Sequence, residues 1–295
     1  PTRSHFDAFA KMEFAETGLP SGTVTNGWIT RFLASRSALG VLRGVALEDI
    51  VPLSLSGADS TLPIADPENF LFPGDPISAQ ERSDLLAEMY ALTPPPVGSA
   101  ALDTFASIDL LGNVDFTGYV PANGVQYPAT PLGNKLRNAA VVIKAQIGVE
   151  VITIDMAGWD LHANLGPLTG SMAAQLNELT GAIEAFYLDM LGQIDDVTLV
   201  VQSEFGRRVQ QNSSTGLDHG HGNAMLVLGG SVAGGQVLGS WPGLAPSQLD
   251  DGDLAITTDY RDVLGEILAG HFGVGASDLA VIFPQHTFSP VGVTV

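Results

Sequence analysis

Residues 149–162 have the sequence VEVITIDMAGWDLH, and the fold prediction starts from this stretch. Its apolar run at 151–154 predicts a buried strand. Apolar runs at 197–201 and 224–228 are typical of two more strands. Between the first two runs, residues 171–191 carry apolar side chains at helical spacing, so this part of the chain predicts a strand–helix–strand unit. Such a unit implies parallel pairing and a right-handed crossover.

Polar residues follow these apolar runs at the point where each predicted strand ends. Asp155, Asp160 and His162 come after the first run, and Glu204 comes after the second. In open parallel sheets, binding and catalytic sites form beyond the carboxyl ends of the strands. We therefore expect the chemistry of the protein at this edge.

Histidines and carboxylates are concentrated in two short segments. One contains Asp160 and His162, and the other contains Asp218, His219 and His221. Carboxylate and imidazole ligands without sulfur suit a divalent metal ion: zinc, manganese, iron, magnesium or calcium. The glycines of the second segment permit the close backbone approach that a metal or phosphate requires. The alternative is that each histidine caps a loop or donates to a backbone carbonyl.

Glu204 leaves an apolar strand directly, so its carboxylate should be partly buried and should need a cation or hydrogen-bond donors. Arg207 could serve, as could a metal shared with Asp155 and Asp160. A structural Glu–Arg pair is the alternative. Arg207 is also one of few cations in the chain and could bind an anionic substrate such as a phosphate or sulfate ester.

Ser4 begins a helix predicted at residues 2–15, with Asp7 three positions later in a variant of the capping box. A hydroxyl at a helix N-terminus lies beside free N–H groups that stabilise anions. Ser4 is therefore a candidate nucleophile towards phosphorus or sulfur. A plain N-cap is the alternative.

Composition narrows the classes of function. Lys+Arg 12 against Asp+Glu 32 gives a net charge of −20, which would repel a nucleic-acid backbone, so we expect no nucleic-acid partner. Such acidity is typical of an extracellular or salt-adapted surface, or of one that collects cations. With no cysteine there is no disulfide and no thiolate metal site. No apolar run reaches the length of a membrane span.

One α/β domain over residues 1–295 is the organisation that we expect. Prolines interrupt residues 57–130, which we interpret as an irregular insertion or cap with one clear helix at 78–92 and no part of the sheet core. A short strand is predicted at 51–56. Further helices are predicted at the ranges 25–34, 134–147 and 258–272.

Several motifs resemble the uncharacterised bacterial family DUF1501: RSHFDA, GWDLH, SEFGRR, DHGHGN, GSWPGL, GDLAITTDYRDVLGEIL and VIFP. The resemblance runs from about residue 2 to 284, with little of it in 57–130. The family is regarded as related to the alkaline phosphatase and sulfatase superfamily. That relation implies an alkaline-phosphatase-like, doubly wound, mostly parallel sheet flanked by helices, with a metal-dependent esterase centre. It also implies export by a twin-arginine signal to the periplasm or the cell exterior.

The superfamily pattern carries over to particular residues of this chain. Ser4 fits the nucleophile, and Asp155 or Asp160 with His162 fits the first ligand pair. The pattern also has an Asp on a first strand, which would lie upstream of residue 1, and a missing N-terminal segment is therefore expected.

The later part of the pattern fits less completely. Glu204 fits the acid of an Asp–His pair, but Phe205 stands where the histidine is expected. His219 or His221 fits the last ligand.

Two functions are consistent with these observations. The first is an exported metal-dependent hydrolase of phosphate or sulfate esters, acting on a small anionic substrate, with Ser4 as nucleophile and Arg207 on the oxyanion. Its expected metal ligands are Asp155, Asp160, His162, Glu204, Asp218, His219 and His221. The alternative is a non-catalytic surface or assembly protein that retains the fold and holds at most a structural cation. A homo-oligomer is open in either case.

Overall fold

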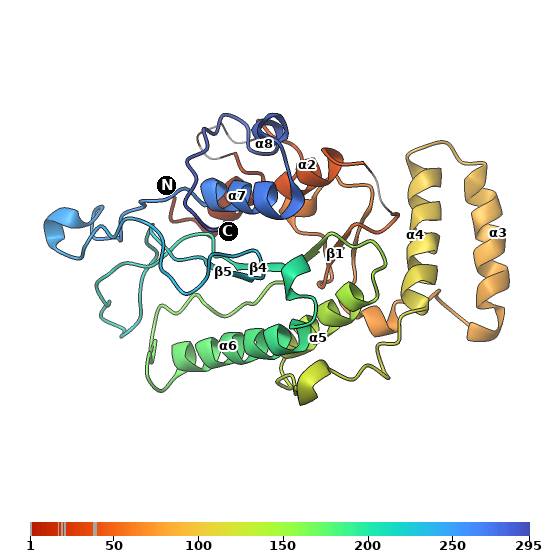
Figure 1. The fold of residues 1–295 in the computed structure, drawn as a ribbon, viewed down its shortest axis with the longest axis horizontal. Coiled ribbons are helices and arrows are strands. Elements are labelled where there is room, and N and C mark those ends of the chain that lie inside the picture. Colours follow the sequence, from red (N-terminus) through yellow and green to blue (C-terminus); the bar gives the residue numbers. More distant parts are fainter. Residues whose placement is uncertain (1, 17, 19, 21, 38–39) are drawn as a thin grey trace.

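The protein is an α/β structure in which short strands form a middle layer between two layers of helices (Figure 1). The computed structural model describes residues 2–16, 18, 20, 22–37 and 40–295. One face of the strands is covered by α5 (Pro131–Lys144) and α6 (Ser171–Met190). The other face is covered by α2 (Trp28–Ala34), α7 (Tyr260–Phe272) and α8 (Ala276–Ile282).

The strands form a three-stranded parallel sheet and an antiparallel pair. In the sheet, β1 (Gly44–Ala46) lies between β2 (Thr61–Pro63) and β3 (Val151–Thr153), and it is parallel to both. In the pair, β4 (Thr198–Val201) runs antiparallel to β5 (Leu226–Gly229). The strands predicted from the three apolar runs are therefore confirmed, with shifts of one or two residues at their ends.

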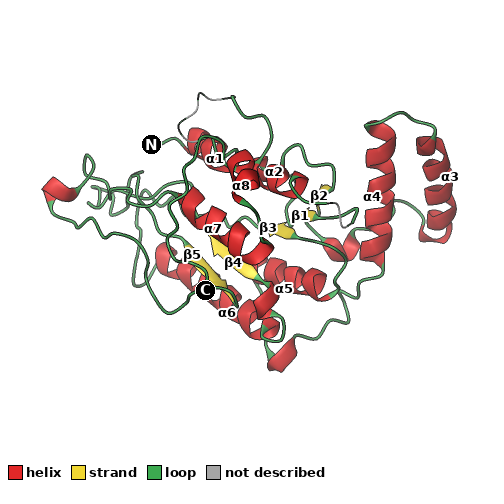
Figure 2. Ribbon diagram, turned by 45° about the horizontal axis from the view of Figure 1, so that its top comes forward, coloured by secondary structure: helices red, strands yellow, loops and turns green. Residues whose placement is uncertain are grey.

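The predicted parallel pairing of β3 with β4 is wrong. Among the described residues, no ladder of hydrogen bonds joins these two strands. β3 is bonded to β1, whereas β4 is bonded to β5. Figure 2 nevertheless shows the five strands following one another across one layer. Strands of three and four residues offer few ladder positions, and side-chain packing holds this part of the layer instead.

Alternate residues of β3 and β4 enter two separate hydrophobic cores, as the two-residue period of a strand requires. Ile152 and Leu199 pack against the core that contains Phe186 of α6. Val151 and Val200 pack against the opposite core, which contains Leu264 of α7. Both strands are thus covered by helices on each face, and this explains why their sequences are mostly apolar and do not alternate with charged residues.

The N-terminal helix α1 (His5–Glu13) begins where the sequence predicts, but the predicted capping box is absent. Ser4 occupies the N-cap position, and its side chain makes no cap hydrogen bond within the described residues. Its backbone carbonyl accepts from Ala8 at 2.9 Å, and its backbone N–H donates to the hydroxyl of Thr2. The Ser4 hydroxyl is therefore not committed to the helix.

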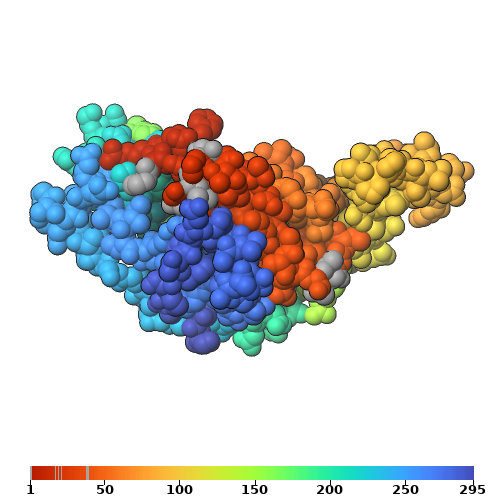
Figure 3. Space-filling view, turned by 90° about the horizontal axis from the view of Figure 1, so that it is seen from above, coloured from red at the N-terminus to blue at the C-terminus, as the bar shows by residue number. Residues whose placement is uncertain are grey.

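The predicted helix at 78–92 is confirmed as α3 (Ala79–Ala91), and it pairs with α4 (Val97–Gly112), which was not predicted. The two helices form an arm that projects from the body of the molecule (Figure 3). The segment 57–130 was predicted to contribute nothing to the sheet. Its first part does contribute, because β2 is an edge strand of the sheet.

The strand predicted at 51–56 is wrong: Leu53–Leu55 form a 3₁₀ turn. Its backbone hydrogen bonds close onto residues three positions earlier, as in the 3.0 Å bond from Leu55 N–H to the Pro52 carbonyl. Within the described ranges, none of the helices has both the length and the apolar character that crossing a membrane requires.

Candidate metal centre

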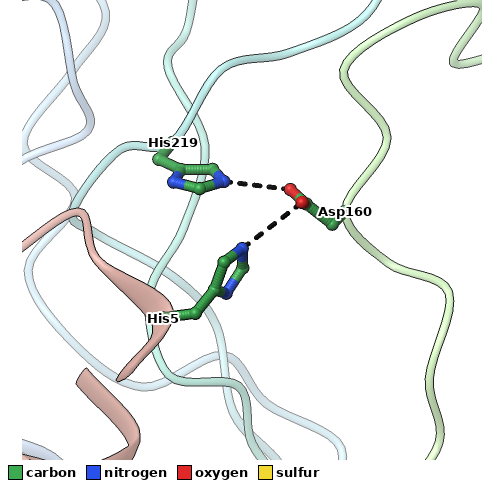
Figure 4. Close-up of side chains that lie close together, drawn as sticks. All are labelled: His5, Asp160 and His219. Atoms are coloured by element: carbon green, nitrogen blue, oxygen red, sulfur yellow. Dashed lines mark hydrogen bonds and ion pairs between the residues drawn. The ribbon is translucent and has the colours of Figure 1, made fainter. Parts of the chain in front are cut away.

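Three segments that are far apart in sequence bring His5, Asp160 and His219 together (Figure 4). His5 is the first residue of α1, Asp160 lies on the loop after β3, and His219 lies on the loop that precedes β5. One ligand atom from each of the three lies within 4.8 Å of the other two, so the group could hold a metal ion.

The carboxylate of Asp160 is the centre of this group. Its Oδ1 lies 3.0 Å from His219 Nε2 and 3.0 Å from His162 Nε2, while its Oδ2 lies 3.4 Å from His5 Nε2. The Nε2 atoms of His162 and His219 are themselves 3.0 Å apart. Imidazoles from three segments thus direct the same ring nitrogen towards one carboxylate.

The other ring nitrogen of each imidazole has an acceptor of its own. The Nδ1 of His5 lies 2.6 Å from Glu204 Oε1, and the Nδ1 of His162 lies 3.1 Å from Asp218 Oδ1. The Nδ1 of His219 lies 2.7 Å from the carbonyl oxygen of Arg3. Acceptors at Nδ1 place the proton there and leave the Nε2 lone pair for a metal, which is the usual arrangement of histidine ligands.

His5 supplies the clearest sign that a cation fits. Its Nε2 is buried and makes no hydrogen bond among the residues that the structure describes, although Asp160 Oδ2 lies 3.4 Å away. A buried polar atom without a partner is costly, and it is explained if an ion completes its coordination. Tetrahedral zinc would separate two nitrogen ligands by about 3.3 Å, which is close to the spacing of the Nε2 atoms here.

Phe205 forms the apolar wall of the group. Its ring centroid lies 4.8 Å from that of His5 and 4.8 Å from that of His219, and its side chain is buried. The resemblance to the superfamily implies a histidine ligand after Glu204. The residue at this position instead packs against two candidate ligands and limits their ring rotation.

Arg207 and the neighbouring histidine keep Asp160 ionised. Partial desolvation raises the pKa of Asp160, but the hydrogen bond from Arg207 and the contact with His219 outweigh it, so the pKa lies well below its usual value. The distance from Arg207 Nη2 to Asp160 Oδ1 is 2.5 Å. An ionised carboxylate at the centre of three imidazoles is the form that coordinates a cation.

Glu204 is held in its ionised form as well. Burial raises its pKa, whereas its own backbone N–H, the hydroxyl of Ser203 and the ring of His5 lower it, and the net shift is downward. The sequence suggested Arg207 as a partner for Glu204. In the structure the partners of Glu204 are His5 and Ser203, and Arg207 contacts Asp160 instead.

The structure brings together most, but not all, of the residues that the sequence singles out. Asp160, His162 and His219 lie in the group, and Glu204 and Asp218 lie behind two of its imidazoles.

His221 and Asp155 contact other residues. His221 Nδ1 lies 3.1 Å from Asp250 and 3.3 Å from Asp253. The backbone N–H of Asp155 donates to Glu48, and Lys135 contacts the Asp155 carbonyl at 3.4 Å.

His5 was not singled out by the sequence, although its motif RSHFDA was. Only the neighbouring Ser4 was interpreted as functional, because a helix start explains a serine and offers no reason for a histidine. The available signal was a histidine at the first position of a helix, beside the candidate nucleophile.

The glycines of the 218–223 segment serve the backbone rather than a ligand. A Cβ on Gly220 would lie 2.5 Å from the Arg207 carbonyl carbon, and one on Gly222 would lie 2.6 Å from the Leu254 carbonyl oxygen. Hydrogen bonds join the same segments, including Gly220 N–H to the Gly206 carbonyl at 2.9 Å. The close approach predicted for a metal or phosphate is an approach between loops, and it fixes where His219 lies.

The fold and this group define an α/β protein with a histidine–carboxylate centre that could hold a metal ion. Residues 139–276 match the model of a family described as a protein of unknown function, DUF1501. This match supports the resemblance stated from the motifs. The matched range contains Asp160, His162 and His219, whereas Ser4 and His5 precede it. No curated protein and no solved structure matches the chain.

Proposed function

We propose that this protein is a metal-dependent hydrolase of phosphate or sulfate esters, with an alkaline-phosphatase-like fold. The observation that carries the proposal is the convergence of three Nε2 atoms on the Asp160 carboxylate, with each Nδ1 held by an acceptor. The location that we propose, the periplasm or the cell exterior, rests on the DUF1501 resemblance alone.

In this proposal His5, His162 and His219 bind the cation through Nε2, and Asp160 binds it through a carboxylate oxygen. A divalent ion held there would supply Lewis acidity to the ester oxygens. Arg207, which the sequence suggested for the oxyanion, has the different task of holding Asp160. Its Nη1 also donates to the Leu217 carbonyl at 3.2 Å, so the guanidinium is bound within the protein.

Ser4 is the proposed nucleophile because it precedes His5 directly and its hydroxyl does not cap α1. Its oxygen would bond to phosphorus or sulfur as the bond to the alcohol oxygen of the ester breaks. The hydroxyl proton passes to solvent, and the departing alkoxide takes a proton from solvent. Water then hydrolyses the seryl ester, which returns the hydroxyl and releases phosphate or sulfate.

The test combines metal analysis with turnover of aryl phosphate and aryl sulfate esters. Purified protein should contain about one equivalent of a divalent metal, and His219→Ala should lose it. Ser4→Ala should keep the metal and lose turnover, whereas Ser99→Ala, at an exposed serine of α4, should keep its activity.

Each outcome of this experiment has a definite meaning. Metal-free wild-type protein that stays inactive after zinc, manganese, iron, magnesium or calcium is added would rule out the hydrolase. Full turnover by Ser4→Ala would remove Ser4 from the mechanism and leave the metal centre in place.

Exposed apolar side chains favour a second function, that of an assembly protein. Ile77 and Leu92, at the ends of α3, are 94% and 88% exposed, and Val237 and Trp241 on the loop after β5 are 100% and 71% exposed. Large exposed apolar side chains of this kind occur at protein–protein interfaces. Sedimentation of the purified protein tests this function, since a monomer at every concentration would contradict it.

A further inference from the structure

A buried carboxylate lies behind the candidate metal centre, outside the group of ligands. Asp253 is 0% exposed, in a protein whose other acidic residues mostly face solvent. Burying a charged carboxylate costs several kcal/mol unless it is paired, so its partners are informative.

The turn that carries Asp253 is encoded locally. Residues 250–253 have the sequence DDGD, and the backbones of Asp250 and Asp253 exchange two hydrogen bonds of 3.0 Å. Asp251 and Gly252 between them have φ values of +50° and +87°, as in a type I′ turn. Asp250 and Asp253 consequently lie side by side, and both contact His221.

The main partner of Asp253 is Arg3. The carboxylate Oδ2 accepts from Arg3 Nε at 2.9 Å and from Arg3 Nη2 at 2.6 Å. The Oδ1 lies 3.5 Å from Arg208 Nε and has no hydrogen-bond partner within the described part of the chain. Asp253 therefore links two parts of the chain. It binds Arg3 of the N-terminal segment, and it also contacts Arg208 and His221 on the connection between β4 and β5.

The backbone of Arg3 also contacts His219. Its carbonyl oxygen is the acceptor for His219 Nδ1, at 2.7 Å. Arg3 also lies two residues before His5, so the segment that Asp253 holds carries one ligand and orients another. A shift of this segment would remove the acceptor that keeps the proton on Nδ1 and would free Nε2 to take it.

We propose that Asp253 is a positioning residue: through Arg3 it fixes His219 with its proton on Nδ1, so that Nε2 faces the metal centre. The part of this inference that concerns metal affinity rests on the proposed function. The part that concerns the imidazole proton does not, because the tautomer can be observed without any metal.

The experiment compares metal-free wild-type protein with Asp253→Asn and Arg3→Lys. Imidazole ¹⁵N NMR should show His219 protonated on Nδ1 in the wild type and mixed between nitrogens in both variants. Zinc titration should show an affinity about 10- to 100-fold lower in both, the usual effect of losing a group that orients a metal ligand.

Asp251→Asn is the matched control. Asp251 is the next acid in the same turn, its side chain is 84% exposed, and it lies 3.6 Å from the same Arg3 guanidinium. Asparagine tolerates the positive φ of this position. This variant should keep the wild-type tautomer and zinc affinity within about twofold.

A wild-type tautomer with unchanged zinc affinity in both Asp253→Asn and Arg3→Lys would overturn the inference. If Asp253→Asn does not fold, the result for Arg3→Lys decides whether the inference holds. This variant should fold, because the Arg3 side chain is 35% exposed and lysine keeps the positive charge. Wild-type protein that binds none of the candidate metals would end the proposed function, and the tautomer comparison would still decide whether Asp253 positions His219.

Discussion

Asp155 and Asp160 lie on the same loop after β3, yet they lie in opposite electrostatic surroundings. Asp160 faces three imidazoles and Arg207, and its pKa is lowered. For Asp155, desolvation by the surrounding protein raises the pKa, the nearby Glu48 raises it further, and Lys135 only partly opposes them.

Helix α1 connects the two regions. Its first residue, His5, contacts Asp160, while its last residue, Glu13, lies near enough to Asp155 for each charge to disfavour the other. Burial is the main cause that raises the pKa of Glu13, and Asp155 adds to it. At 1.5 Å per residue, His5 and Glu13 are roughly 12 Å apart along the helix. Carboxylates at the strand edge thus differ in their charged partners, because only one end of α1 brings an imidazole.

The largest expected effect is a difference in zinc affinity between variants of the two aspartates. Asp160→Ala should lower zinc affinity by about 100-fold or more, because it removes the group on which the imidazoles converge. Asp155→Ala should change it by less than about threefold. Zinc titration of the two variants measures both. Equal losses would mean that the centre extends to Asp155 and that the comparison is wrong.

A smaller effect should distinguish the histidine that the sequence missed from one that it singled out. His5→Gln should lower zinc affinity by about 30-fold, because it removes a ligand whose Nε2 has no other described partner. His221→Gln should have little effect, because His221 lies outside the described group of ligand atoms and contacts Asp250 and Asp253 instead. A larger loss in His221→Gln than in His5→Gln would reverse the assignment.

The smallest effect concerns stability and pH. Because the folded state raises the pKa of Asp155, its ionisation disfavours folding above the folded pKa, and this cost vanishes as pH falls below the unfolded value of about 4. Asp155→Asn should therefore raise the unfolding free energy at pH 7 by about 0.5 kcal/mol or less, given the solvent around this exposed residue. Urea unfolding at pH 7 and pH 4 should show a smaller gain at the lower pH.

Much of the fold follows from periodicity in the sequence. The apolar runs that became β3 and β4 contact a hydrophobic core on each face, and helices α5, α6 and α7 have one apolar side each, so both patterns are visible in the chain. Periodicity fails for β1 and β2, since the apolar runs around them, at 45–47 and 62–64, are shorter than the run that contains β3 and are too short to show a period. It also fails for α4, which follows Pro94, Pro95 and Pro96 and contains Gly98.

The sequence indicated that histidines and carboxylates would form the candidate site, and it singled out Asp160 and His219 but not His5. Strand ends indicated Asp160, which the structure brings together with His5 and His219, because a sheet places the ends of its strands at one edge. The position of His5 depends on how α1 packs against loops some 200 residues later in the chain, which no local pattern encodes. For the same reason His219 and His221, two residues apart, could not be told apart before their contacts were known.

The distance along the chain between His5 and Glu204 is 199 residues, and that between Arg3 and Asp253 is 250. An ion bound by His5 and His219 would act as a reversible cross-link that closes a loop of most of the chain. Such a link exists only in the folded state, so each tenfold excess of ion over its dissociation constant would add about 1.4 kcal/mol to the unfolding free energy. The thermal midpoint would then report ion concentration.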